Sequence, residues 1–120
     1  MFRFQKLKVY TLAKEIVIYN YKLTKSFPDQ ERYSLVQQMN RAAISIPSNI
    51  AEGTSRNSIK DRIHFINIAY ASLMELTCQT EIALDLKYIN LDEYNEFINK
   101  SKNLSVKLSN FMKYMKNEIK

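Results

Sequence analysis

The chain has 120 residues, enough for one domain with a single hydrophobic core and too few for two such domains. Its 46% hydrophobic and 25% charged residues are typical of a globular protein and exclude a disordered one. One Gly and two Pro exclude a sandwich or barrel built on many tight turns and favour long helices, and the formal net charge of +6 is compatible with an acidic partner.

The first predicted helix runs from about Leu7 to Lys25 and ends at Phe27-Pro28, because proline disfavours helical geometry in the residue before it. Apolar side chains recur along it at helical spacing, and these are Val9, Leu12, Ala13, Ile16, Leu23 and Phe27. Tyr10, Val17 and Tyr21 fall outside this stripe.

The second helix is predicted from about Asp29 to Arg56, with Pro47 inside it. Proline removes one hydrogen bond and crowds the carbonyl of Ala43, which predicts a kink. The apolar stripe keeps helical phase across the proline through Leu35, Met39, Ala42, Ala43, Ile46 and Ile50. We therefore expect one kinked helix up to Gly53, where an end is predicted.

The third helix is predicted from a cap at Ser58 and Asp61 to about Lys87, and the fourth from a cap at Asn90 and Glu93. The third has the core stripe Ile59, Ile63, Ile66, Tyr70, Leu73, Leu76, Thr80 and Leu84. The fourth has Tyr94, Phe97, Leu104, Leu108, Phe111, Met115 and Ile119. These patterns predict an all-α protein in which residues 1–120 form one antiparallel up-down-up-down four-helix bundle.

A second set of apolar residues lies away from these stripes. It comprises Ile44 on the second helix and Phe65, Ile68, Ile82 and Leu86 on the third. Scattered surface apolar residues are normal, but these recur along helical rows. We expect them to form an oligomer interface.

The sequence contains no catalytic or phosphate-binding motif, and we expect no enzymatic activity, metal or cofactor. His64 is interpreted as a solvated surface histidine, and Cys78, the single cysteine, as a half-buried structural thiol. A lone cysteine favours a reducing compartment, and the charged start MFRFQKLKVY is no signal-peptide core. Without a long apolar stretch, we expect a cytoplasmic protein with no membrane partner.

Polar residues recur at threes and fours along the second helix. They are Gln38, Arg41, Ser45, Ser48, Asn49, Glu52 and Arg56. This row would form either a binding groove or a hydrogen-bond network between helices or subunits. In the network, Ser45 and Asn49 would bond carbonyls freed by Pro47, and Glu75 is one candidate charge partner.

Lysines form a second polar pattern, on the fourth helix. Lys102, Lys113, Lys116 and Lys120 fall on one face, and residues 1–25 add six Lys and Arg against one acid. A basic surface fits RNA or another acidic partner, or it is only a solvated face.

The segment RAAISIPSNIAEG occupies residues 41–53. Around it stand Phe27-Pro28, Glu31, Leu35, Gln38, Arg56, Phe65, Ala69, Ser72 and Glu75. This pattern resembles the four-helix bundle protein family encoded within intervening sequences of bacterial 23S rRNA genes. The chain departs from it at Asn40, where a basic residue often stands, and at Ala71, where a glycine is common.

The resemblance implies a ring-like pentamer without established enzymatic activity. Members are often labelled ribosomal proteins because of gene location, and a related retroelement accessory protein binds a reverse transcriptase and is thought to contact nucleic acid. We therefore expect a non-enzymatic oligomeric bundle that binds RNA or an RNA-associated protein. The alternative is a protein-binding adaptor or structural oligomer without nucleic-acid affinity.

Overall fold

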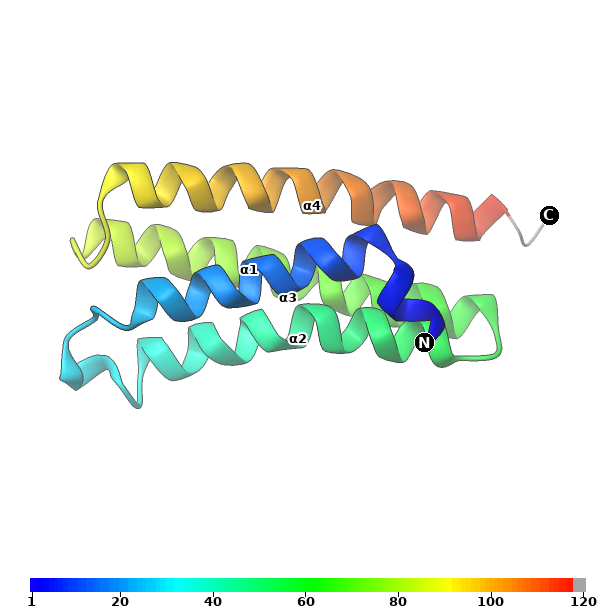
Figure 1. Cartoon of the computed structure of the whole chain (residues 1–120), viewed down its shortest axis with the longest axis horizontal. Helices are drawn as coiled ribbons and strands as arrows, with labels where there is room; N and C mark the ends of the chain where they lie inside the picture. The colour runs from blue at the N-terminus through cyan, green and yellow to red at the C-terminus, as the bar shows by residue number, and fades with distance from the viewer. Residues whose placement is uncertain (118–120) are drawn as a thin grey trace.

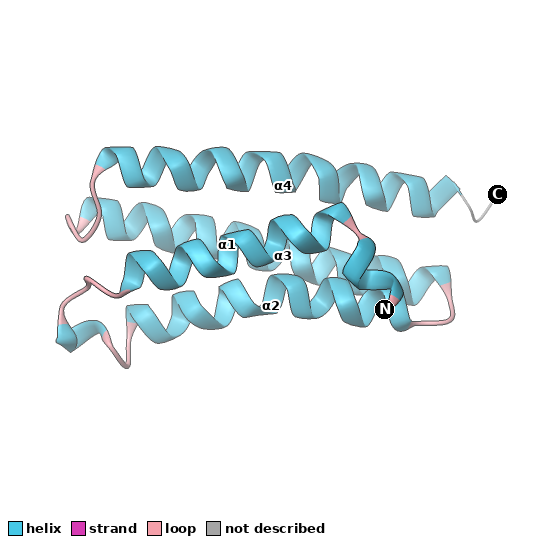
Figure 2. Ribbon diagram, in the orientation of Figure 1, coloured by secondary structure: helices cyan, strands magenta, loops and turns pink. Residues whose placement is uncertain are grey.

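A computed structural model describes residues 1–117. In chain order the elements are η1 (Arg3–Lys6), α1 (Lys8–Thr24), η2 (Asp29–Glu31), α2 (Leu35–Ser55), α3 (Ile59–Asp85) and α4 (Leu91–Asn117), where η marks a short 3-10 helix. Within this range no strand is formed (Figure 2). Successive helices run in opposite directions, so the predicted all-α, up-down-up-down bundle is confirmed (Figure 1).

Each long helix contacts two others around the bundle. α1 packs on α2 and α4, α3 packs on α2 and α4, and α1 lies diagonally opposite α3, with no Cα atoms of the two within 8 Å of each other. The bundle is elongated, with extents of 49 × 24 × 23 Å. The order of the helices therefore places α2 between α1 and α3.

The predicted starts of the third and fourth helices are confirmed by their capping bonds. The Ser58 side chain accepts a hydrogen bond from the Asp61 amide at 3.1 Å. Asn90 and Glu93 bond each other's backbone amides at 2.8 and 2.9 Å. These bonds satisfy amides that otherwise have no partner at a helix start.

The predicted start of the second helix was wrong. Residues 29–31 form the separate helix η2, and α2 begins only at Leu35. The intervening residues Arg32, Tyr33 and Ser34 are all exposed. Because helices in proteins gain most of their stability from packing an apolar face, this segment has little to hold it in the bundle.

The prediction of one helix across Pro47 is confirmed, because α2 runs without interruption to Ser55. Pro47 itself is buried. Figure 1 shows α2 as one continuous ribbon, and the kink at Pro47 stays a prediction.

The predicted end of α2 is confirmed, because the helix ends at Ser55 and Gly53 is buried within its last turn. A Cβ atom at this position would lie 3.1 Å from Phe65 Cβ and 3.2 Å from the Arg62 carbonyl oxygen, both on α3. The missing side chain therefore lets the ends of α2 and α3 approach closely.

We predict that Gly53→Val lowers the free energy of unfolding by about 2 kcal/mol. The larger side chain would force the helices apart, which outweighs its better helix propensity. Urea denaturation measures the loss, with the exposed Ser55→Val as the matched control. A Gly53→Val protein as stable as the parent would show that α3 moves aside at no cost.

The core follows the predicted stripes, with Ile16, Met39, Leu73 and Phe97 among its fully buried side chains. Ile119 lies outside the described residues. The sequence analysis missed Tyr19, Asn20 and Thr24, which are buried on α1. Asn20 Nδ2 donates to Asn40 Oδ1 on α2 at 2.8 Å, while Asn20 Oδ1 is buried without a hydrogen-bond partner.

Tyrosine hydroxyls join segments that are distant in sequence. Tyr19 on α1 donates to the Glu93 carbonyl of α4 at 3.1 Å, and burial raises the pKa of Tyr19 to about 12. Tyr88 donates to the Glu31 carboxylate at 2.7 Å, and this bond raises the pKa of Tyr88. Both phenols therefore remain protonated donors at neutral pH.

Candidate functional site

The polar row of α2 begins its contacts with α3 at Ser45. Ser45 Oγ lies 2.8 Å from Ser72 Oγ, and Asn49 Nδ2 donates to Ser45 Oγ at 2.9 Å. Asn49 also donates to the Ser45 carbonyl at 2.8 Å. The expectation that these side chains bond the carbonyl freed by Pro47 was wrong, because that carbonyl belongs to Ala43.

Glu52 and Arg56 continue the row toward the end of α2. They form an ion pair one turn apart, and the Arg56 guanidinium lies 4.6 Å from the centre of the Phe65 ring. The Arg56 carbonyl accepts from Arg62 Nε at 2.7 Å. These bonds join α2 to the start of α3, which agrees with a network between helices.

The rest of the row points outward. Gln38, Arg41 and Ser48 are exposed, and no side-chain hydrogen bond is formed by them within residues 1–117. Glu75 accepts instead from Gln79 on its own helix at 3.4 Å. The candidate contact between Arg41 and Glu75 is therefore not made inside one chain.

Three of the five predicted interface residues are well exposed, namely Ile44, Ile82 and Leu86 at 44%, 43% and 49%. Phe65 and Ile68 are half-buried. Phe65 is partly covered by Arg56 and by the close approach at Gly53, so some of its apolar surface is used within the chain.

The lysines of α4 lie on an unbroken helix. Lys102, Lys113 and Lys116 are all exposed, whereas Lys120 lies outside the described residues. Lys113 and Lys116 lie one turn apart near the end of α4, and Lys102 lies about 16 Å earlier along the axis. The structure therefore brings two of the four predicted lysines together.

Charge is uneven along the bundle. The start of α1, the end of α2, the start of α3 and the end of α4 lie together at the right of Figure 1. We call this half, residues 1–16, 45–72 and 104–117, the basic end, and it has ten Lys and Arg against three Asp and Glu. Residues 17–44 and 73–103, in the other half, have seven against eight.

Most cations of the basic end lack an acidic partner. Among residues 1–117 the single ion pair is Arg56–Glu52, which involves one of the ten cations of the basic end. The remaining charges are therefore available to a polyanion. The sequence showed the basic surplus of residues 1–25 but not that the antiparallel topology places part of it beside the end of α4.

A hollow of about 390 Å³ separates α1 from α4 at the basic end. Its lining includes Lys8 from α1 and Lys107, Asn110 and Phe111 from α4. Tyr114, which is 61% exposed, follows Lys107 and Asn110 at the three-and-four spacing of one helix face. Two cations and a carboxamide thus line one depression, and Tyr114 continues the same face of α4 beyond it.

The structure assembles no site for metal chemistry in the residues it describes, where no three His, Cys, Asp or Glu side chains gather. His64 is exposed and lies edge-on to the Phe65 ring, with the ring centres 5.4 Å apart. Cys78 is exposed, so its interpretation as a half-buried thiol was wrong. No helix within residues 1–117 combines the length and the apolar character that crossing a bilayer demands.

Comparison with known proteins agrees with this architecture. Residues 5–110 match the family described as 23S rRNA-intervening sequence protein. The chain belongs to this family. The match covers all of α1, α2 and α3 and most of α4.

Among solved structures, the protein resembles one of unknown function from the S23 ribosomal protein family of Bacteroides thetaiotaomicron VPI-5482. The two share 25% identity and a TM-score of 0.81, over 88% of this chain and 98% of the other. No curated protein matches the sequence.

The family match separates the two polar patterns of this 23S rRNA-intervening sequence protein. The polar row of α2, Glu75, Lys102 and Lys107 all lie inside residues 5–110, whereas Lys113 and Lys116 follow the last matched residue. The matched range therefore includes the residues that join α2 to α3, and the last turns of α4 extend beyond it.

Proposed function

We propose that this member of the 23S rRNA-intervening sequence protein family is a non-enzymatic bundle that binds RNA through its basic end. The observation that supports it is the surplus of ten cationic over three anionic residues in that half. Nucleic-acid phosphates attract such a surface whatever the base sequence, because binding of lysine and arginine to them releases their counterions. The other half is nearly neutral, so the molecule has one preferred orientation toward a polyanion.

The hollow between α1 and α4 supplies specific contacts with RNA that net charge alone does not provide. Lys8 and Lys107 approach it from two helices, so one backbone phosphate could meet both. Tyr114 offers an exposed ring for an unstacked base, and Asn110 offers a donor and an acceptor. No base-reading motif accompanies them, so we expect sequence-tolerant binding to single-stranded RNA.

The test reverses three charges at the basic end, in a Lys107→Glu/Lys113→Glu/Lys116→Glu protein. Anisotropy of a labelled single-stranded RNA is measured across a salt series. We expect at least about a 10-fold loss of affinity at low salt and a salt slope flatter by about 2, since each lost phosphate contact contributes roughly 0.7 on single strands.

The matched control reverses three exposed lysines in the other half, in a Lys22→Glu/Lys25→Glu/Lys87→Glu protein. Both variants change the net charge equally, so only position distinguishes them. The control should bind nearly as the parent does. A parent that fails to bind at 50 mM salt, or a control that loses as much affinity, rules out the basic end as an RNA site.

Self-association is a second candidate, favoured by the exposure of Ile44, Ile82 and Leu86. Exposed apolar side chains arranged in rows are typical of surfaces that a partner covers. The pentamer implied by the family resemblance remains a prediction, as does a protein partner such as a reverse transcriptase. Light scattering at micromolar concentration measures the oligomeric state.

A further inference from the structure

The surface between α1 and α2 is hollowed in the half of the bundle away from the basic end. This hollow has a volume of about 440 Å³, which is within the range of pockets for small ligands. Two tyrosines, two arginines and two carboxamides line it, namely Tyr21 from α1, Arg32 and Tyr33 from the segment between η2 and α2, and Gln37, Asn40 and Arg41 from α2. We call it the arginine hollow. Side chains of these kinds bind phosphate, stack on flat rings and bond the edges of bases.

The two arginines of the arginine hollow lack an acidic partner. Neither Arg32 nor Arg41 forms an ion pair with any residue of 1–117, and no Asp or Glu from this range lines the hollow. Glu31, next to Arg32 in sequence, accepts instead from the Tyr88 hydroxyl at 2.7 Å. Asp29 lines an adjoining hollow of about 340 Å³, which Arg32 borders as well. Two guanidinium groups therefore remain for an anion, and their paired donors match the oxygens of a phosphate group.

A buried contact fixes the carboxamide of Asn40 at the arginine hollow. Asn20, which is fully buried on α1, donates from Nδ2 to Asn40 Oδ1 at 2.8 Å. Because this bond occupies the oxygen of Asn40, its nitrogen is the group left for a ligand, and that nitrogen is a donor. Asn40 therefore adds a positioned hydrogen-bond donor to the two arginines, which again favours an anion.

The tyrosines of the arginine hollow leave ring surface uncovered. Tyr33 is 81% exposed and Tyr21 is 43% exposed, so the core of the bundle makes little use of the Tyr33 ring. The guanidinium carbon of Arg32 lies 5.9 Å from the centre of the Tyr33 ring. A flat face for stacking thus stands directly beside a phosphate-binding group, and a nucleotide combines a base with a phosphate in the same way.

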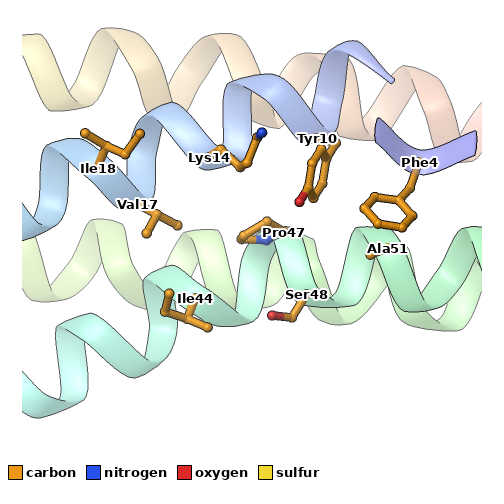
Figure 3. A pocket seen from close by; sticks show the side chains of 9 residues that line it. All are labelled: Phe4, Tyr10, Lys14, Val17, Ile18, Ile44, Pro47, Ser48 and Ala51. Atoms are coloured by element: carbon orange, nitrogen blue, oxygen red, sulfur yellow. The ribbon is translucent and has the colours of Figure 1, made fainter. Parts of the chain in front are cut away.

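The neighbouring hollow along α2 lacks this combination of groups. It has a volume of about 410 Å³, and Figure 3 shows the side chains that line it. Ile44 belongs to both hollows, but here the lining is mainly apolar, with Val17 and Pro47 among its members. Its one cation is Lys14, whose Nζ lies 4.9 Å from the centre of the Tyr10 ring. A pair of unpartnered arginines therefore distinguishes the arginine hollow, and Lys14 offers a matched control.

We propose that the arginine hollow binds a nucleoside monophosphate. The phosphate lies between Arg32 and Arg41, where Asn40 donates to it, and the base stacks on Tyr33. The chemistry recognised is a phosphate monoester joined to a flat base, which a free nucleotide and the 5′-phosphate end of an RNA both carry. This inference goes beyond the proposed RNA binding and does not depend on it, because the arginine hollow shares no residue with the basic end.

The test begins by separating the two halves of the ligand. NMR titrations of the full chain at 50 mM salt compare AMP with adenosine, which lacks the phosphate, and with ribose 5-phosphate, which lacks the base. We expect AMP to bind with a Kd below about 1 mM. Each half should bind at least about 10-fold more weakly, because it keeps only the stacking or only the phosphate contacts.

Three single variants then assign each contact to its residue. Arg41→Gln should weaken AMP binding at least about 10-fold and leave adenosine binding unchanged, because only the phosphate loses a charged hydrogen bond. Tyr33→Leu should weaken AMP and adenosine alike by about 10-fold and leave ribose 5-phosphate unchanged, because only stacking is lost. Lys14→Gln removes the same charge from the neighbouring hollow and should bind AMP as the parent does. All three side chains are exposed, so circular dichroism should show folded bundles.

Other outcomes overturn the inference. A parent that binds AMP with a Kd above about 1 mM shows that the arginine hollow is no nucleotide site. A Lys14→Gln protein that loses as much affinity as Arg41→Gln reduces the effect to net charge. If the Lys107→Glu/Lys113→Glu/Lys116→Glu protein loses AMP binding while Arg41→Gln keeps it, the phosphate binds at the basic end. That last result would leave the proposed RNA binding standing.

Competition separates the two sources of the nucleotide. Bound AMP is challenged with a short RNA that carries a 5′-phosphate and with the same RNA ending in a 5′-hydroxyl. If only the phosphorylated RNA displaces AMP, the hollow accepts the end of an RNA chain. If neither RNA displaces AMP, the ligand is a free nucleotide. Displacement by both RNAs alike, retained in the Arg41→Gln protein, would contradict recognition of a terminal phosphate in this hollow.

Discussion

Phe97→Ala is expected to lower the free energy of unfolding by about 3–5 kcal/mol. Phe97, on α4, is the largest of the fully buried side chains. Truncation removes the apolar area that the ring buries and leaves a cavity that long, packed helices cannot readily close. Because natural domains are stable by only about 5–15 kcal/mol, this single change should bring the protein near its unfolding threshold.

Urea denaturation at fixed protein concentration measures this loss, since any self-association would add a concentration-dependent term. Val106→Ala, at an exposed position of the same helix, should change stability by no more than about 0.5 kcal/mol. A loss below about 1 kcal/mol for Phe97→Ala would mean that the side chains around it refill the space.

Asn20→Asp should be nearly as damaging, and the damage should depend on pH. Asn20 is fully buried, and its side-chain nitrogen donates to Asn40 Oδ1. The substitution keeps the shape but replaces the donor with a second acceptor, which faces the Asn40 oxygen. Burial disfavours the charged form, so the pKa of the introduced carboxyl should lie above its unfolded value of about 3.9.

The sign of the pH dependence follows from that shift. An acid whose pKa is higher in the folded than in the unfolded state lowers stability little below its unfolded pKa. The loss of stability grows as the pH rises above that value and levels off above the folded pKa. We therefore expect a modest loss relative to the parent at pH 4 and about 3 kcal/mol or more at pH 7. Denaturation curves at both pH values test it. Asn20→Leu cannot ionise, so its effect should be the same at both, and equal losses for Asn20→Asp would contradict a buried charge.

Much of the fold could be predicted from the sequence because local signals and packing agree. The caps at Ser58 and Asn90 and the 3.6-residue stripes fix three helix starts and the core face of every helix. The start of α2 could not be predicted, because Asp29 after Pro28 has the composition of a helix start. Whether a helix persists there depends on packing that Arg32 and Tyr33 do not provide.

The surfaces were harder to predict than the core. Periodicity separated Ile82 and Leu86 from the core stripe of α3, and the structure leaves both exposed. It could not show that Lys8 lies across a hollow from Lys107, because that proximity comes from pairing the first helix with the last. Asn20 was missed for a related reason, since a buried carboxamide is recognised only when its partner on α2 is known.

Two hydroxyl pairs hold α3 between its neighbours, little more than one helical turn apart along its axis. Ser45 and Ser72 join it to α2, and Thr77 and Ser101 join it to α4, each with oxygens 2.8 Å apart. Thr77 donates its own proton to the Leu73 carbonyl, so Ser101 is the donor in the second pair. Sliding α3 along its axis by one residue would turn these small groups away from one another and bring bulky ones to the contact. Gradual shear between the helices is therefore blocked, and the bundle should transmit a force applied at one end to the other as a stiff rod.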